Sequence, residues 1–218
     1  MKIYFACPTG DRRNKIVKEH GDKFGACLTR DVFNNITANM MPWFFDNGAF
    51  SDWKNDRAFN HQKFADKMLE IEFKIRFGYI PPPDFVVVPD IVGEGTKSLE
   101  RSVQWMDYLE NNFPHNKYYL AIQDGMSFFM VESLIKKRLF DGLFVGGTKP
   151  WKYRDGAKWV RLAQKYGLPI HCGGVGTRKN LLWAKDAGFD SSDSGLAMIH
   201  PRHLKDVLNI DKEMLWSA

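Results

Sequence analysis

The chain has 218 residues, of which 44% are hydrophobic and 26% charged, with a formal net charge of +5 and a sequence pI near 9.0. This composition predicts one globular domain over residues 1–218 and argues against a disordered, collagen-like or membrane protein. The apolar run at residues 2–7 stops at a Pro-Thr-Gly turn, too early for a signal sequence or a spanning helix, so we expect a cytoplasmic protein.

Apolar runs typical of short buried strands recur along the whole chain. They lie at residues 2–7, 24–29, 43–46, 85–90, 119–123, 142–146, 169–173 and 189–192. Helix-like stretches follow most of them, at 62–77, 98–111, 127–139, 155–166 and 178–187. Alternating strands and helices predict parallel pairing and an α/β fold, namely a minimal (β/α)8 TIM barrel. A flavodoxin-like open sheet is the alternative, because the run at 24–29 is weak and the segment 53–83 is long.

Cysteine and histidine residues give no metal-binding pattern. Cys7, Cys27 and Cys172 are widely spaced in apolar segments, which indicates reduced core thiols. His200 and His203 flank the start of a predicted surface helix and lack a third ligand. We therefore expect neither a metal nor another cofactor.

Several predicted strands end in a polar residue or a glycine pair. Asp46, Asp90, Gln123 and the pair Gly146-Gly147 stand at such ends, and Asp193 stands in the segment 188–195 after the last helix. Each aspartate alone is more simply a helix cap or an ion-pair partner. Together they favour an active site, because the carboxyl ends of barrel strands converge. Asp193 is the candidate nucleophile.

Basic and aromatic residues are interleaved after residue 148. This mixture suits contact with a nucleic-acid strand, through its phosphates and by stacking on its bases. The alternative is a solvated helix whose aromatic side chains pack inward. The candidate nucleic-acid contacts are Lys149, Trp151, Lys152 and Arg154, with Arg178 at the start of a later helix.

Motifs over most of the chain occur in the order of a known family. They are Phe-Asp-Asn-Gly-Ala-Phe at 45–50, Lys-Ser-Leu-Glu-Arg-Ser-Val-Gln-Trp at 97–105, Ile-Gln-Asp-Gly at 122–125, Asp-Gly-Leu-Phe-Val-Gly-Gly at 141–147, Gly-Val-Gly-Thr at 174–177 and Gly-Phe-Asp-Ser-Ser-Asp at 188–193. The chain thereby resembles the tRNA-guanine transglycosylases, and more closely their short phage relatives that insert 7-deazaguanine bases into DNA.

The resemblance implies a role for each motif. Asp193 would be the nucleophile that attacks the sugar, and Asp46 would transfer protons. Asp190 is a secondary candidate that would either hold the backbone near Asp193 or merely cap a turn. Asn47 replaces the serine of the family motif, which implies an altered base pocket. The residues implied to contact the base are Asp90, Gln123, Gly146, Gly147, Asn47 and Phe50.

The resemblance also implies the reaction and its partners. The Cys-x-Cys-x-x-Cys zinc pattern of the tRNA enzymes is missing from the sequence, so we expect DNA rather than tRNA, with a free 7-deazaguanine-type base as the second substrate. A phage or phage-derived protein acting in a bacterial host fits this expectation, with a homodimer or a partner protein possible. The alternatives are a DNA glycosylase that leaves an abasic site and a non-catalytic nucleic-acid-binding barrel.

Overall fold

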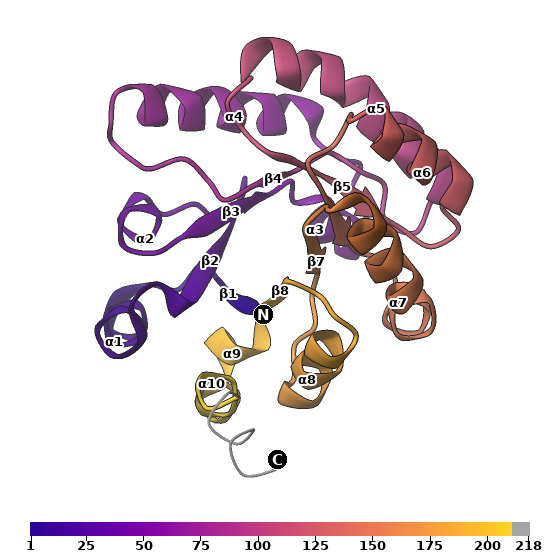
Figure 1. Cartoon of the computed structure of the whole chain (residues 1–218). Coiled ribbons are helices and arrows are strands. Elements are labelled where there is room, and N and C mark those ends of the chain that lie inside the picture. The colour runs from indigo at the N-terminus through magenta and orange to yellow at the C-terminus, as the bar shows by residue number, and fades with distance from the viewer. Residues whose placement is uncertain (211–218) are drawn as a thin grey trace.

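Eight parallel strands close into a barrel in the computed structural model, which describes residues 1–210 (Figure 1). Each strand pairs with the next in sequence, and the last pairs with the first through Lys2↔Ser191 to Phe5↔Ser194. The predicted TIM barrel is confirmed, and the open-sheet alternative is wrong because β8 closes on β1. The strands are β1 (Lys2–Ala6), β2 (Phe24–Thr29), β3 (Trp43–Asp46), β4 (Val86–Val87), β5 (Tyr118–Ile122), β6 (Gly142–Val145), β7 (Ile170–Cys172) and β8 (Ser191–Ser194).

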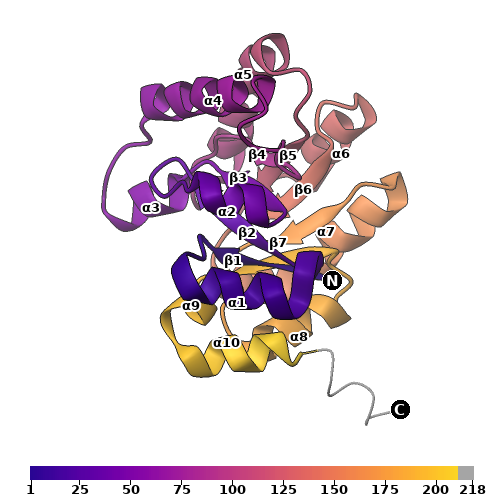
Figure 2. The same ribbon diagram turned by 90° about the vertical axis from the view of Figure 1, so that its left-hand side faces the viewer.

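Helices surround the barrel and cover its outer surface (Figures 1 and 2). The last helices lie beside the first, where the Arg12 side chain donates to the Met198 carbonyl (Figure 2). Within residues 1–210, no helix combines the length and apolar character needed to span a bilayer. The helices are α1 (Gly10–His20), the short 3-10 helix η1 (Gly21–Lys23), α2 (Asn35–Met40), α3 (Ala49–Lys54), α4 (His61–Arg76), α5 (Gly95–Asn112), α6 (Phe128–Lys136), α7 (Lys149–Tyr166), α8 (Arg178–Asp186), α9 (Leu196–Ile199) and α10 (Pro201–Leu208).

Two elements differ from the sequence-based expectation. Helix α7 begins at Lys149 rather than at 155, because Pro150 in its first turn is compatible with a helix start. Strand β4 has only two residues, since Pro89 has no N–H to donate to a neighbouring strand. The helix expected at 62–77 is confirmed as α4, which together with the end of α3 accounts for much of the long segment 53–83. The final residues of the predicted domain, 211–218, lie outside the described residues.

Aromatic rings fill the part of the barrel interior nearer the N-terminal ends of the strands. This aromatic layer is closely packed: the Phe85 ring stacks on Tyr119 at 4.0 Å and on Phe44 at 4.6 Å between centroids. Glycines make room for the rings, since a Cβ on Gly25 would lie 2.4 Å from the Tyr4 ring. A second, larger core lies between the strands and the helices. The aromatic layer consists of Tyr4, Phe44, Phe85, Tyr119 and Phe144.

Strand alternation brings polar residues to the other end of the same interior. Successive side chains of a strand point to opposite faces, so a residue two positions after an inward ring also points inward. Asp46 follows Phe44 in this way, and Gln123 follows the inward Tyr119 and Ala121. The barrel therefore presents polar side chains at the carboxyl ends of its strands, directly beyond the aromatic layer.

Candidate active site

Asp193 is held at the barrel mouth by two donors from β7 and the loop after it. The Gly174 N–H donates to Asp193 Oδ1 at 2.8 Å, and His171 Nε2 lies 3.1 Å from the same oxygen. Gly174 and His171, the two partners of the Asp193 side chain among the described residues, both contact Oδ1. Asp193 Oδ2 is consequently the oxygen that can meet a substrate.

His171 connects Asp193 to the barrel interior, a role that sequence reasoning missed. Its ring is fully buried and stacks on Phe144 with centroids 4.8 Å apart. Burial lowers the pKa of His171, which favours the neutral imidazole. In the neutral form the ring can donate from Nε2 to Asp193 while Nδ1, 2.9 Å from Ser191 Oγ, accepts from that hydroxyl. The available signal was a histidine in the middle of an apolar strand.

Asp46 occupies a different environment at the end of β3. Its Oδ1 accepts from the Gly48 N–H at 2.7 Å, across a turn in which Gly48 has a φ of +80°. Burial raises the pKa of Asp46 to about 7, the Gly48 hydrogen bond opposes this shift, and the charges of Asp193 and Asp90 reinforce it. A carboxyl group with this pKa can both give and take a proton at neutral pH.

Asp90 lies at the centre of a buried amide network. Its Oδ1 accepts from Asn47 Nδ2 at 2.8 Å, and its Oδ2 accepts from Gln123 Nε2 at 2.6 Å. Burial raises the pKa of Asp90 to about 6, against the lowering effect of these two donors. Asn47 also donates to the Val88 carbonyl at 2.8 Å, so its amide position is fixed.

Gln123 extends the same network to the glycine pair. Its Oε1 accepts from the Gly147 N–H at 3.0 Å and from the Gly93 N–H at 3.1 Å. A Cβ on Gly146 would lie 2.6 Å from Gln123 Nε2, so only glycine allows this approach. The structure thus brings together five of the six predicted base contacts. Hydrogen bonds join Asp90, Asn47, Gln123 and Gly147, and Gly146 packs against the Gln123 amide.

Phe50 and Asp190 lie apart from this network. Phe50 is an exposed residue of α3, and its ring lies 5.7 Å from that of Trp53. Asp190 precedes β8 at the opposite end of the strand from Asp193, where its Oδ2 accepts from the Ile170 N–H at 2.9 Å. The prediction that Asp190 holds the backbone near Asp193 is therefore corrected: it fixes the start of β7.

The basic segment after Gly147 is the first part of α7, which agrees with the alternative of a helix whose aromatic side chains pack inward. Trp151 and Lys152 are buried there, and Lys152 Nζ donates to the Gly173 carbonyl. Their burial corrects the prediction that they contact nucleic acid, because neither is accessible to a phosphate or a base. Lys149 and Arg154 are exposed, and Arg178 is half-buried at the first position of α8.

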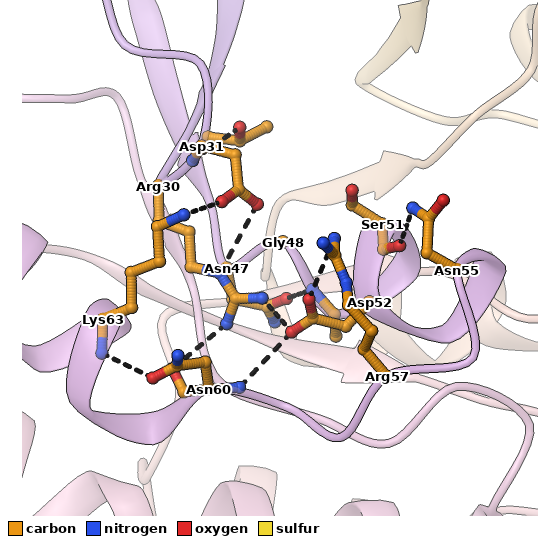
Figure 3. Close-up of polar contacts among 12 residues, drawn as sticks. Arg30, Asp31, Asn47, Gly48, Ser51, Asp52, Asn55, Arg57, Asn60 and Lys63 are labelled. Carbon is orange, nitrogen blue, oxygen red and sulfur yellow. Dashed lines mark hydrogen bonds and ion pairs between the residues drawn. The ribbon is translucent and has the colours of Figure 1, made fainter.

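A buried arginine fixes the turn that carries Asp46 (Figure 3). Arg30 NH2 forms an ion pair with Asp52 of α3, and Arg30 NH1 donates to the Asn60 carbonyl at 3.2 Å. The Arg30 side chain packs against the turn, since a Cβ on Gly48 would lie 3.0 Å from its Nε. Arg30 was not predicted as a site residue, because its contacts join three separate segments. Its positive charge opposes the rise in the pKa of Asp46.

Neither a metal site among the described residues nor a match to a known protein indicates the function of this chain. Among residues 1–210, no group of three or more His, Cys, Asp or Glu side chains is placed to hold a metal ion. The sequence matches no protein-family model, and a search of curated proteins finds no match. A function for this chain must therefore be inferred from its motifs and from the geometry of the barrel mouth.

Proposed function

We propose that this protein exchanges guanine in DNA for a 7-deazaguanine base through a covalent aspartyl-sugar intermediate. The observation that carries the proposal is a pair of carboxylates at one barrel mouth in contrasting surroundings. Asp193 is fixed by two partners on one oxygen, whereas burial raises the pKa of Asp46 to about 7. Contrasting surroundings of this kind assign different chemical roles to two like groups.

Glycosyl exchange requires a nucleophile and a group that carries a proton. Asp193 Oδ2 attacks the anomeric carbon, and the bond from that carbon to the base nitrogen breaks as the base takes the proton of Asp46. An incoming base then gives its ring proton to the Asp46 carboxylate and attacks the same carbon. The ester to Asp193 breaks, and both side chains return to their starting states.

The amide network supplies partners for a guanine-like edge. The ring N–H and amino group of such a base are donors that Asp90 can accept, and its carbonyl can accept from the Gln123 amide or the Gly147 N–H. In the structure these groups bond one another. The base would replace hydrogen bonds that already exist, so the network keeps its buried polar groups satisfied when no base is bound.

The choice of DNA, and of 7-deazaguanine as the incoming base, depends on the sequence resemblance. The net charge of +5 and the exposed Lys149 and Arg154 favour a polyanionic partner. A base within a duplex must leave its stack before Asp193 can reach the sugar.

The test is incorporation of labelled guanine or a labelled 7-deazaguanine base into duplex DNA and, in parallel, into tRNA, with abasic sites scored in the same samples. We expect incorporation into DNA with the wild type and with Asp190→Asn, and none with Asp193→Asn. The two variants make the same chemical change at opposite ends of β8, so a general effect on folding would affect both.

Each other outcome contradicts a defined part of the proposal. Abasic sites without incorporation would indicate a glycosylase, with water in place of the incoming base. Label in tRNA alone would overturn the choice of polymer. DNA binding without any reaction in the wild type would indicate a binding barrel.

A further inference from the structure

An exposed aromatic cluster lies at the C-terminal end of α4, outside the candidate active site. Leu69, Phe73, Phe77 and Tyr79 are between 52% and 60% exposed. The Phe73 ring lies 4.6 Å from the Phe77 ring and 6.3 Å from the Tyr79 ring. Contiguous apolar surface of this kind on a folded domain marks an interaction site.

Polar contacts join helix α2 to α4 and the segment after it. The Asn39 side chain donates to the Tyr79 carbonyl at 2.8 Å, and Lys74 Nζ donates to Asn35 Oδ1 at 3.0 Å. These bonds hold α2 against the end of α4. Ile36 and Met40 of α2 are also exposed, so both neighbouring helices carry exposed apolar side chains.

The charges along the exposed face of α4 are arranged so that the face complements itself. Leu69, Glu70, Phe73, Arg76 and Phe77 share one side of the helix, because they are spaced three or four residues apart. The acidic Glu70 precedes Phe73 and already pairs with Lys67 and Lys74 of its own helix, whereas the basic Arg76 follows Phe73. The Glu70 side chain is still 40% exposed, so it remains accessible to a cation from a second copy. When two copies of α4 pack antiparallel with their Phe73 residues facing, Leu69 lies opposite Phe77 and Glu70 lies opposite Arg76.

We propose that α4 packs antiparallel against α4 of a second copy of this chain, with Phe73 at the two-fold axis. A two-fold interface uses the same patch on both subunits, so the patch must be complementary to itself. The charge order of α4 meets this requirement.

The candidate active sites stay open in this dimer. Helix α4 begins after the carboxyl end of β3 and ends before the start of β4, so it runs opposite to the strands (Figure 1). Two antiparallel α4 helices therefore place the two barrels antiparallel, with their mouths facing in opposite directions. The inference does not depend on the proposed function.

Disulfide trapping tests the position of the axis, because a residue on a two-fold axis faces its own copy. We expect Phe73→Cys to form a disulfide-linked dimer under mild oxidation at micromolar concentration. Phe129→Cys is the matched control: Phe129 is 80% exposed on α6, away from α4. The unmodified chain, which has Cys7, Cys27 and Cys172, controls for the native thiols.

Charge reversal tests the pairing in the wild-type cysteine background. Glu70→Arg and Arg76→Glu should each raise the dimer Kd by at least about tenfold, measured by sedimentation equilibrium, and the double reversal should restore it. A wild-type chain that stays monomeric at all concentrations would overturn the proposal. A disulfide-linked dimer that forms through Phe129→Cys and not through Phe73→Cys would also overturn the proposal. The same holds if neither charge reversal changes the dimer Kd.

Discussion

The two ends of the barrel interior differ in chemistry although the same strands build both. The aromatic layer packs rings against one another and against glycines, and the Tyr4 hydroxyl donates to Asp84 at 2.6 Å beneath it. The opposite end, the polar layer, collects Asp46, Asp90, Asp193 and Gln123. Rings in contact stabilise the fold, whereas neighbouring buried carboxylates oppose it. Residues that oppose folding are retained where a function needs them.

Asp193→Asn should have the largest effect and should separate the two layers most clearly. Asparagine keeps an oxygen that can accept from Gly174 but is a poor nucleophile, so we expect the exchange rate to fall by about 10⁴-fold or more. The melting temperature should stay unchanged or rise. Single-turnover exchange and calorimetry on the same samples measure both. Equal losses of activity and stability would contradict the division of roles between the layers.

Asp46→Asn should reduce release of the leaving base by about 10²- to 10⁴-fold, the usual contribution of a positioned acid or base. The wild-type rate of base release should fall as the pH rises above about 7, where Asp46 loses its proton. The variant has no such group, so its slow rate should not change across this range. Single-turnover measurements from pH 5 to 9 test the expectation. If Asp46→Asn shows the same pH dependence of base release as the wild type, Asp46 is not the acid.

The raised pKa of Asp46 predicts how the free energy of unfolding depends on pH. The pKa of Asp46 is about 7 in the folded chain against an ordinary value of 3.8, so between these values the folded state holds more protons than the unfolded state. The free energy of unfolding of the wild type should therefore decrease as the pH rises through this window. The stability advantage of Asp46→Asn over the wild type should grow from pH 4 to pH 7. A constant difference would contradict the raised pKa.

Phe85→Ala makes the converse change in the aromatic layer. Phe85 is buried between Tyr119 and Phe44, so its truncation leaves a cavity and should cost about 3–5 kcal/mol of unfolding free energy. The exchange rate per folded molecule should change little. Urea denaturation measures the loss, and Phe129→Ala at an exposed position is the control, with an expected change within about 0.5 kcal/mol. If Phe85→Ala loses activity without losing stability, the aromatic layer does not serve stability alone and the division of roles between the two layers is contradicted.

The features that could be predicted from the sequence are those that a single strand and its end residues reveal. Apolar runs that alternate with helix-like stretches led to the barrel, and the polar residues at strand ends led to Asp46, Asp90, Gln123 and Asp193 at its mouth. Contacts between strands and loops were not predictable in this way. Besides its neighbour Asp31, Arg30 contacts Asp52 of α3 and Asn60 at the N-cap of α4, and nothing near Arg30 in the sequence indicates these two distant partners.

The burial of Trp151 agrees with the alternative of a helix whose aromatic side chains pack inward, whereas the burial of Lys152 was not predicted. The start of the helix at Lys149 sets which side chains turn inward, and the sequence had placed that start at residue 155. Composition indicates what a segment can bind, whereas exposure depends on where its helix begins. The surviving part of the nucleic-acid prediction therefore comprises only the exposed Lys149 and Arg154 together with Arg178.

His171 belongs to both layers, and its replacement should have the smallest effect. His171→Phe keeps a ring to stack on Phe144 but removes the donor to Asp193, so kcat should fall by about 10- to 100-fold, as expected for one hydrogen bond to a charged group. The KM for DNA should stay unchanged, because no contact with the strand is lost. His171→Gln offers an amide donor and should recover part of kcat. If both variants lose kcat and stability together, His171 serves only to pack the barrel, and the orientation of Asp193 must come from the Gly174 N–H alone.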